Sequence, residues 1–237
     1  MQRIAGAVQG QASLCKPSPS HTDAMLTKTK ILLLPAVALI SLAVSQPAFY
    51  PQTATTEARN TGPEYTPNGE FKLPENYRQW VYLTTGFDMS YNPAMSMDHH
   101  MFDNVFVDPA SYKAFVGTGT WPDKTMLVLE VRSAEGKGSI NQKGNFQSTE
   151  VMGIEVHVKD EARFPGKWAF FGVDDGPAGG KTGKMFPVGA ECYKCHAAHA
   201  AVDTTFVQFY PTLLPIAKSK GALSAAYQQE SAAAGKK

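Results

Sequence analysis

The residues with the clearest chemical meaning are Cys192, Cys195 and His196, which form a Cys-x-x-Cys-His motif late in the chain. This spacing is the attachment signal of a c-type haem. Two thiols three residues apart lie within one helical turn, so both reach the two vinyl groups of a single porphyrin. The adjacent His196 then lies under the iron, and a His is a standard protein ligand of haem iron. The motif therefore predicts one covalent haem c, with His196 as the iron ligand.

Two other chemistries use similar residues. A Cys-x-x-Cys pair forms the redox dithiol of thioredoxin-like domains, but it normally follows the first strand there, and this pair lies late in the chain. A zinc site would use Cys192, Cys195, His196 and His199, although structural zinc sites usually take ligand pairs from separated turns. We favour haem, and the two alternatives stay open.

The charge balance argues against two kinds of partner. The 237-residue chain has a formal net charge of +1. A near-neutral protein has no strong field to attract nucleic acid or an acidic membrane, so we expect neither as a partner. The length allows one domain of generous size, with or without a leader.

Residues 1–45 have the pattern of a leader with a signal peptide. A short basic segment begins at Met25, which we interpret as the true start, and an apolar segment follows at 31–44. Ala43 and Ser45 supply the small residues of a cleavage site. The apolar segment is short for a bilayer and contains Pro35, so we expect no stable membrane anchor, with an uncleaved anchor as the alternative. The pattern predicts export to the periplasm.

The remaining chain predicts a single domain. Residues 46–70 are rich in Pro, Thr, Gly and Asn and are expected to be a flexible lead-in, 71–220 a haem domain, and 221–237 a tail. Strands are expected at 81–85, 104–107, 125–132, 150–159 and 168–172, and helices at 73–80, from Asp108, around the haem motif and from Asp203. This order predicts an α+β fold: an antiparallel β-sheet with a few helices, in which a late C-terminal helix carries the haem.

The segment 150–159 is the most informative strand. Met152, Ile154, Val156 and Val158 form one face of this strand and are predicted to face a core. The opposite face is predicted to meet water or line a cavity, and it consists of Val151, Gly153, Glu155, His157 and Lys159.

The sixth ligand of common electron-transfer cytochromes c is absent. Those proteins are helical and place an axial Met after the haem motif, whereas the last Met here is Met185, which precedes it. A sixth ligand would have to come from His99, His100 or the methionines at 89, 95, 97 and 101. Exposed or loosely packed loop residues are the simpler interpretation of this group.

Several segments, in the right order, resemble the cytochrome P-460 and cytochrome c′-beta family. They are 76–81, 105–112, 153–160, 168–170, 191–196 and 203–211, and the resemblance spans roughly residues 70–218. It implies a β-rich homodimer with one five-coordinate haem, open on its distal side to small nitrogen species.

The resemblance also implies roles for two strand residues. In the P-460 branch, a strand lysine is cross-linked to the porphyrin and the proteins oxidise hydroxylamine. By register that lysine falls on Leu129, which has no nucleophilic nitrogen, and Lys124 is a poor substitute. Glu155 matches the distal carboxylate of the family. Leu129 therefore shifts the expectation towards the c′-beta branch, which binds nitric oxide in an apolar pocket. Phe102 and Phe106 are further candidates for the lining of that pocket.

The expected function is that of an exported mono-haem c-type cytochrome that binds nitric oxide or related small nitrogen species at an open iron. One alternative is an enzyme that oxidises hydroxylamine or reduces peroxide, with Glu155 as proton acceptor. Another is an electron-transfer cytochrome with both axial positions filled, which would exchange electrons with a small redox protein.

Overall fold

A computed structural model describes residues 62–90, 99–173 and 180–235, which all belong to one compact unit of the chain. The expected leader at 1–45 lies outside the described residues, as do Met95, Met97 and residues 46–61 of the expected lead-in. No helix formed by the described residues has the length and hydrophobicity that a membrane span requires.

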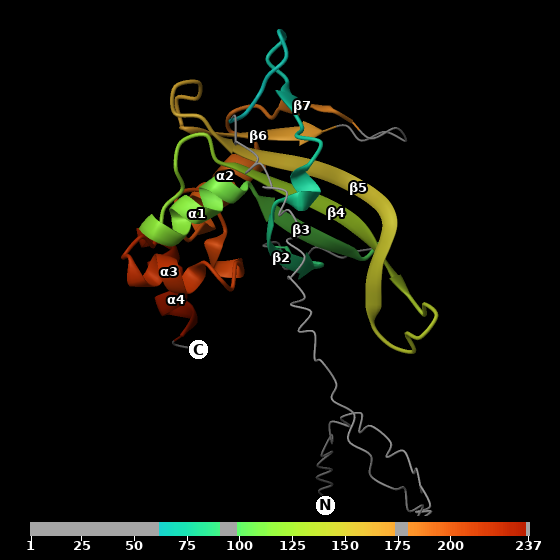
Figure 1. Cartoon of the computed structure of the whole chain (residues 1–237). Helices are drawn as coiled ribbons and strands as arrows, with labels where there is room; N and C mark the ends of the chain where they lie inside the picture. The colour runs from blue at the N-terminus through green and yellow to red at the C-terminus, as the bar shows by residue number, and fades with distance from the viewer. Residues whose placement is uncertain (1–61, 91–98, 174–179, 236–237) are drawn as a thin grey trace, which may run out of the picture. The chain divides into compact units, whose positions relative to one another are not determined.

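Seven antiparallel strands form one sheet in the spatial order β1-β7-β6-β5-β4-β3-β2 (Figure 1). From β2 to β6, each strand pairs with the next one along the chain. The strands are β1 (Phe71–Lys72), β2 (Val81–Phe87), β3 (Met101–Val107), β4 (Met126–Gly136), β5 (Asn145–Lys159), β6 (Trp168–Val173) and β7 (Thr182–Met185).

Four α-helices accompany the sheet, so the predicted α+β class with an antiparallel sheet is confirmed. In Figure 1, α1, α3 and α4 gather beside one end of the sheet. The segment expected to be a tail contains α4, which lies against α2. The helices are α1 (Pro109–Thr118), α2 (Glu191–His199), α3 (Leu214–Ser219) and α4 (Ala225–Ala234), with short 3-10 helices η1 (Tyr77–Gln79) and η2 (Val207–Phe209).

Asp108 and Gly119 set the two ends of α1. The carboxylate of Asp108 accepts a hydrogen bond of 2.8 Å from the backbone N–H of Ser111, and Pro109 occupies the first helical position. Gly119 has a φ of 81°, a left-handed conformation that glycine adopts without strain and that ends the helix. The predicted start of this helix is confirmed.

Each face of the sheet has its own hydrophobic core. On one face, Leu127 packs with Phe115 of α1, with Ala217 of α3 and with other buried residues of the helical side. On the other face, Val128, Val156 and Val158 pack with Phe71 and Tyr77 from the N-terminal part of the described chain. Within the described chain, α1 and α3 therefore cover the first of these two faces, and the cavity beside His196 lies on that face.

β5 shows the predicted alternation, with one error. Ile154, Val156 and Val158 are buried on the face opposite the helices, but Met152 is 41 % exposed. Val131 pairs with Gly153 and the next residue, Arg132, pairs with Val151, so β5 has one extra residue at this point. This β-bulge puts Val151, rather than Met152, on the core face.

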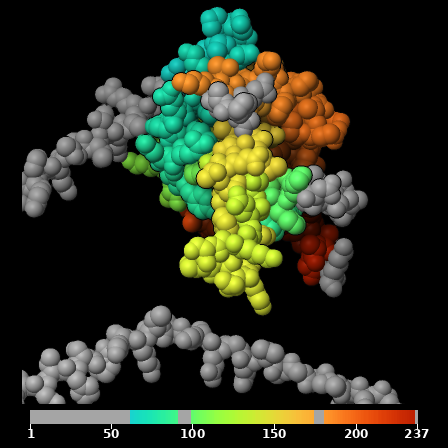
Figure 2. All heavy atoms as spheres, turned by 90° about the vertical axis from the view of Figure 1, so that its right-hand side faces the viewer, coloured from blue at the N-terminus to red at the C-terminus, as the bar shows by residue number. Residues whose placement is uncertain are grey.

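β4 and β5 are the longest strands, and their connection at residues 137–144 projects from the body of the domain (Figure 2). The tip is open to solvent, since Ile140 is 94 % exposed. The residues that match the expected site, Leu129 and Glu155, lie in the other half of this pair, where β3 and β6 flank it.

The helix expected from Asp203 does not form. Asp203 has a φ of 51°, and the hydroxyl of Thr205 donates to the carbonyl of Val202 at 2.8 Å while accepting from Nε1 of Trp121 at 2.7 Å. These contacts close a tight turn, so only the short η2 follows. The helix expected at 73–80 is likewise reduced to η1, because the chain is already extended at Trp80 and enters β2.

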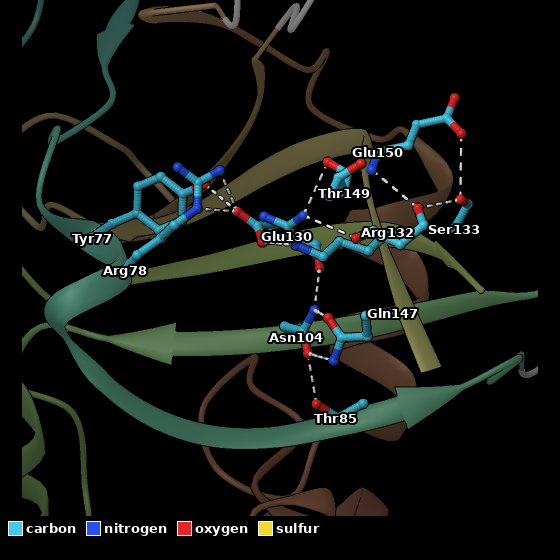
Figure 3. A network of polar contacts seen from close by, with 11 residues as sticks. Tyr77, Arg78, Thr85, Asn104, Glu130, Arg132, Ser133, Gln147, Thr149 and Glu150 are labelled. Carbon is cyan, nitrogen blue, oxygen red and sulfur yellow. Dashed lines mark hydrogen bonds and ion pairs between the residues drawn. The ribbon is translucent and has the colours of Figure 1, made fainter. Parts of the chain in front are cut away.

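A polar network lies on the sheet face opposite the helices (Figure 3). Glu130 is 2 % exposed and accepts hydrogen bonds from the hydroxyl of Tyr77, from Arg78 and from Arg132. Below it in the figure, the side-chain amides of Asn104 and Gln147 hydrogen-bond each other at 2.8 and 2.9 Å. The network ties the N-terminal part of the described chain to the centre of the sheet.

Candidate functional site

The haem motif forms α2. Ala190 precedes it as the N-cap residue, and Cys192, Cys195 and His196 lie within two turns, so their side chains share one side of the helix. Both cysteines are free thiols, which is the state that thioether formation needs. No three His, Cys, Asp or Glu side chains converge as metal ligands in the described part of the chain. His199 instead lies with Nδ1 3.1 Å from a carboxylate oxygen of Glu230 on α4.

One hydrogen bond fixes the imidazole of His196. Nδ1 lies 2.7 Å from the backbone carbonyl oxygen of Thr204, and because that oxygen can only accept, Nδ1 carries the proton. Nε2 is then left with a lone pair, which is the nitrogen state that binds a metal. Burial lowers the pKa of His196, although the same hydrogen bond opposes this effect, so the neutral ring is favoured.

Three rings hold His196 in place. Their centroids lie 4.2 Å away for Phe206, 4.6 Å for Phe170 and 5.2 Å for His157. His157 stacks on Phe170 with a centroid distance of 3.9 Å, and its Nε2 lies 3.2 Å from the hydroxyl of Thr204. Thr204 therefore contacts both histidines, and the orientation of His196 is fixed by β5, β6 and the 202–205 turn together.

His196 opens into a cavity of about 500 Å³ on the helical face of the sheet. This volume is within the usual range for a small-molecule or cofactor site. The sheet forms one wall and the segment after α2 forms another, with aromatic side chains prominent in both. The lining includes Thr84, Gly86, Val105, Leu127, Leu129, Glu155, His157, Phe170, His196, Phe206, Phe209 and Tyr210.

Leu129 and Glu155 lie side by side in this wall. They are directly paired across β4 and β5, and Val105 of β3 pairs with Leu129 on its other side. Burial raises the pKa of Glu155, which makes its carboxyl a better proton acceptor than an exposed glutamate. The structure thus brings Leu129, Glu155 and His196 to one cavity.

Other expected candidates lie elsewhere. Phe102 and Phe106 point to the opposite face of β3, where Phe106 packs against Tyr77 with a centroid distance of 6.0 Å. His99 and His100 are exposed, and His100 pairs with Asp88. Lys124 pairs with Asp160 and is absent from the lining of the cavity.

Met89 is the one described member of the Met group that lines the cavity. Its sulfur packs so closely over Gly86 that a Cβ at Gly86 would lie 2.6 Å from it. Met89 is 45 % exposed, so it lies at the rim.

Two further residues line the cavity without having been candidate site residues. The alternation of β5 placed His157 on the same face as Glu155, and the structure has both in the cavity wall. Asp103 of β3 also lines the cavity, and burial raises its pKa to about 6, with the charges of Asp88 and Glu155 adding to the effect. Asp103 falls in the segment 86–103 that the sequence analysis did not assign to a strand, so no alternation pointed to it.

The residues present fit an iron porphyrin. The cavity is largely apolar, His196 offers a neutral nitrogen to it, and two free thiols lie on the same helix. These features together define a haem-binding protein of the cytochrome type.

Comparison with known families agrees with this assignment. A family model for cytochrome P460 matches residues 74–207, which is more than half of the chain. The chain therefore belongs to the cytochrome P460 family, and the family implies a haem cofactor. No curated protein matches the chain.

Proposed function

We propose that this chain is an exported mono-haem c-type cytochrome that binds nitric oxide or a related small nitrogen species at an open iron site. Cys192 and Cys195 would form the two thioether bonds, and His196 would bind the iron through Nε2. The observation that carries the proposal is the composition of the wall beside Glu155, where the neighbouring side chains Leu129 and Val105 cannot bind iron.

Different residues of the cavity would hold the iron ligand and shape the space for the bound molecule. When bound, haem supplies an iron atom that coordinates small ligands. Thr204 holds His196 in the tautomer that binds iron, and the rings of Phe170 and Phe206 limit its rotation. Leu129 and Val105 keep the cavity poor in hydrogen-bond donors, which favours a neutral diatomic ligand over water.

The optical spectrum tests this proposal. We expect the fully reduced protein to give a broad high-spin spectrum that changes when nitric oxide is added, because Leu129 and Val105, the side chains beside Glu155 in the cavity wall, offer the iron no second ligand. Sharp low-spin bands that are indifferent to nitric oxide would contradict it. They would favour the electron-transfer alternative, with Met89 as the first ligand to test, since it lines the cavity.

A second candidate is hydroxylamine oxidation. It is favoured by Glu155, a carboxyl in the cavity whose pKa is raised by burial and which can accept a proton from a bound N–H or O–H group. It is disfavoured by Leu129, which occupies the position of the cross-linking lysine. The distinguishing measurement is turnover of hydroxylamine with an added electron acceptor. Turnover that falls at least ~100-fold in Glu155→Gln would establish this function instead.

Export and assembly belong to the same proposal. The signal-peptide pattern at 1–45 supports a periplasmic location, and the family resemblance supports a homodimer. Tyr82 is 53 % exposed and packs against Phe106 on the sheet face opposite the cavity, so its ring is accessible to a second copy of the chain. Light scattering on the mature protein, with N-terminal sequencing of the secreted chain, tests both statements.

A further inference from the structure

The cavity beside His196 is lined by three acidic residues and, among the described residues, by neither lysine nor arginine. The acidic residues are Asp88, Asp103 and Glu155. Residues 91–98, which connect Ser90 to His99, also contain no Lys or Arg in the sequence. Anion-binding sites are usually built with arginine, lysine or a helix N-terminus, so this composition is the opposite of an anion site.

Asp103 and Glu155 reach the cavity from different strands. Asp103 lies two residues before Val105 on β3, so both point to the same face. Val105 pairs with Leu129, which pairs with Glu155, so the two acidic residues are separated by β4 and offset by two residues along the strands. They flank the apolar patch formed by Val105 and Leu129 rather than contacting each other across a strand pair.

Neither of these two carboxyls has a cationic partner among the described residues. Within the described residues, Asp103 and Glu155 form no ion pair, whereas Asp88 is paired with His100. Partial burial makes the charged form of each carboxyl less favourable, and no cation among the described residues offsets this cost. Uncompensated carboxylates in a concave, largely apolar site give it a negative potential.

We propose that Asp103, together with Glu155, is a specificity-determining residue that makes this cavity exclude anionic ligands and admit neutral or cationic ones. This inference rests on the proposed function, because it requires an iron that is open to added ligands. It goes further in naming Asp103 and in predicting that the oxidised anion nitrite is rejected. A neutral nitrogen ligand meets no such repulsion, and the apolar patch between the two carboxyls accommodates it.

Ligand titration of the ferric haem-loaded protein tests this. The probes are sodium nitrite and sodium azide as anions, and imidazole as a neutral nitrogen ligand, each followed by the shift of the Soret band. At about pH 8, above the pKa of about 6 for Asp103, we expect Asp103→Asn and Glu155→Gln each to tighten the binding of both anions by roughly 10-fold, since each removes a negative charge close to the ligand. Imidazole affinity should change less than about twofold.

Two further measurements keep the test independent of any one variant. Glu135→Gln removes the same charge from an exposed position at the far end of β4 and should leave anion affinity unchanged. Raising the salt concentration should strengthen azide binding to the unmodified protein, because salt screens the repulsion.

The outcomes separate this inference from the proposed function. Protein that binds imidazole and nitric oxide, but whose anion affinities are unchanged in both cavity variants and by salt, would overturn the role of Asp103 and leave the proposed function standing. A spectrum that responds to no added ligand would overturn both. Tightening in Glu155→Gln alone would remove Asp103 from the assignment.

Discussion

Replacing both Cys192 and Cys195 with Ala is expected to abolish covalent haem attachment completely. Both thiols are free and lie on one side of α2, next to the nitrogen that would bind iron. The chain has one other cysteine, Cys15, and it lies in the expected leader, so no thiol remains to form a thioether. The measurement is haem staining of a denaturing gel, with the intact mass of the chain, after expression with a c-type maturation system.

His196→Ala is the matched control for this experiment. It keeps both thiols, so we expect the haem stain to survive in the denaturing gel while the spectrum loses the features of histidine-bound iron. A single cysteine variant should keep one thioether and hence some stain. Staining that persists in the double variant would contradict the assignment of the motif, as would an unmodified chain that matures without covalent haem.

Glu130→Gln is expected to lower the free energy of unfolding by about 3 kcal/mol, the lower end of the range for breaking a buried ion pair. Glu130 is 2 % exposed and accepts hydrogen bonds from Tyr77 and from two arginines (Figure 3). The side chain of Arg78 is 52 % exposed, so water screens part of its interaction, whereas that of Arg132 is only 20 % exposed. The neutral amide leaves both arginines without their carboxylate partner. Urea unfolding of the haem-loaded proteins measures the difference.

The effect of this substitution should depend on pH. Burial alone raises the pKa of Glu130, but the hydrogen bonds from Tyr77, Arg132 and Arg78 outweigh it and hold the pKa below the ordinary value of 4.5. A carboxyl whose pKa is lower in the folded state stabilises the protein above its unfolded pKa, and this stabilisation is lost as the pH falls through the folded pKa. The difference between the two proteins should therefore be largest near neutral pH and shrink progressively below 4.5.

Glu135→Gln again provides the control, because Glu135 lies on the same strand but is exposed. We expect it to change the free energy of unfolding by no more than about 0.5 kcal/mol. A loss in Glu130→Gln that is equal at neutral and acidic pH would mean that the shape of the side chain, and not its charge, stabilises the network.

Local patterns in the sequence were sufficient to predict part of the fold and part of the site. Asp108 and Pro109 predicted the start of α1 because capping depends on a few adjacent residues. Alternation along β5 placed Glu155 on the face opposite Val156, and the structure has Glu155 in the cavity wall. The Cys-x-x-Cys-His spacing predicted that its three residues share one side of a helix, because helical geometry repeats locally.

The tertiary structure decided what depends on partners distant in the sequence. Met152 left the core because β4 pairs with β5 through a bulge, and a bulge is set by the pairing of two strands rather than by either one alone. The helix expected from Asp203 does not form, because Thr205 closes a turn in which it also accepts a hydrogen bond from Trp121, which lies 84 residues earlier.

The chemistry of the site also depends on contacts that only the folded chain makes. The sequence supplied His196, but the carbonyl of Thr204 determines which of its nitrogens carries the proton. The sequence supplied Asp103, but only the pairing of β2, β3 and β4 shows that it faces the same cavity as Glu155. By itself the sequence predicted a haem cofactor and the residues that would hold it, whereas the folded sheet decided the charge and polarity of the space in which a ligand would bind.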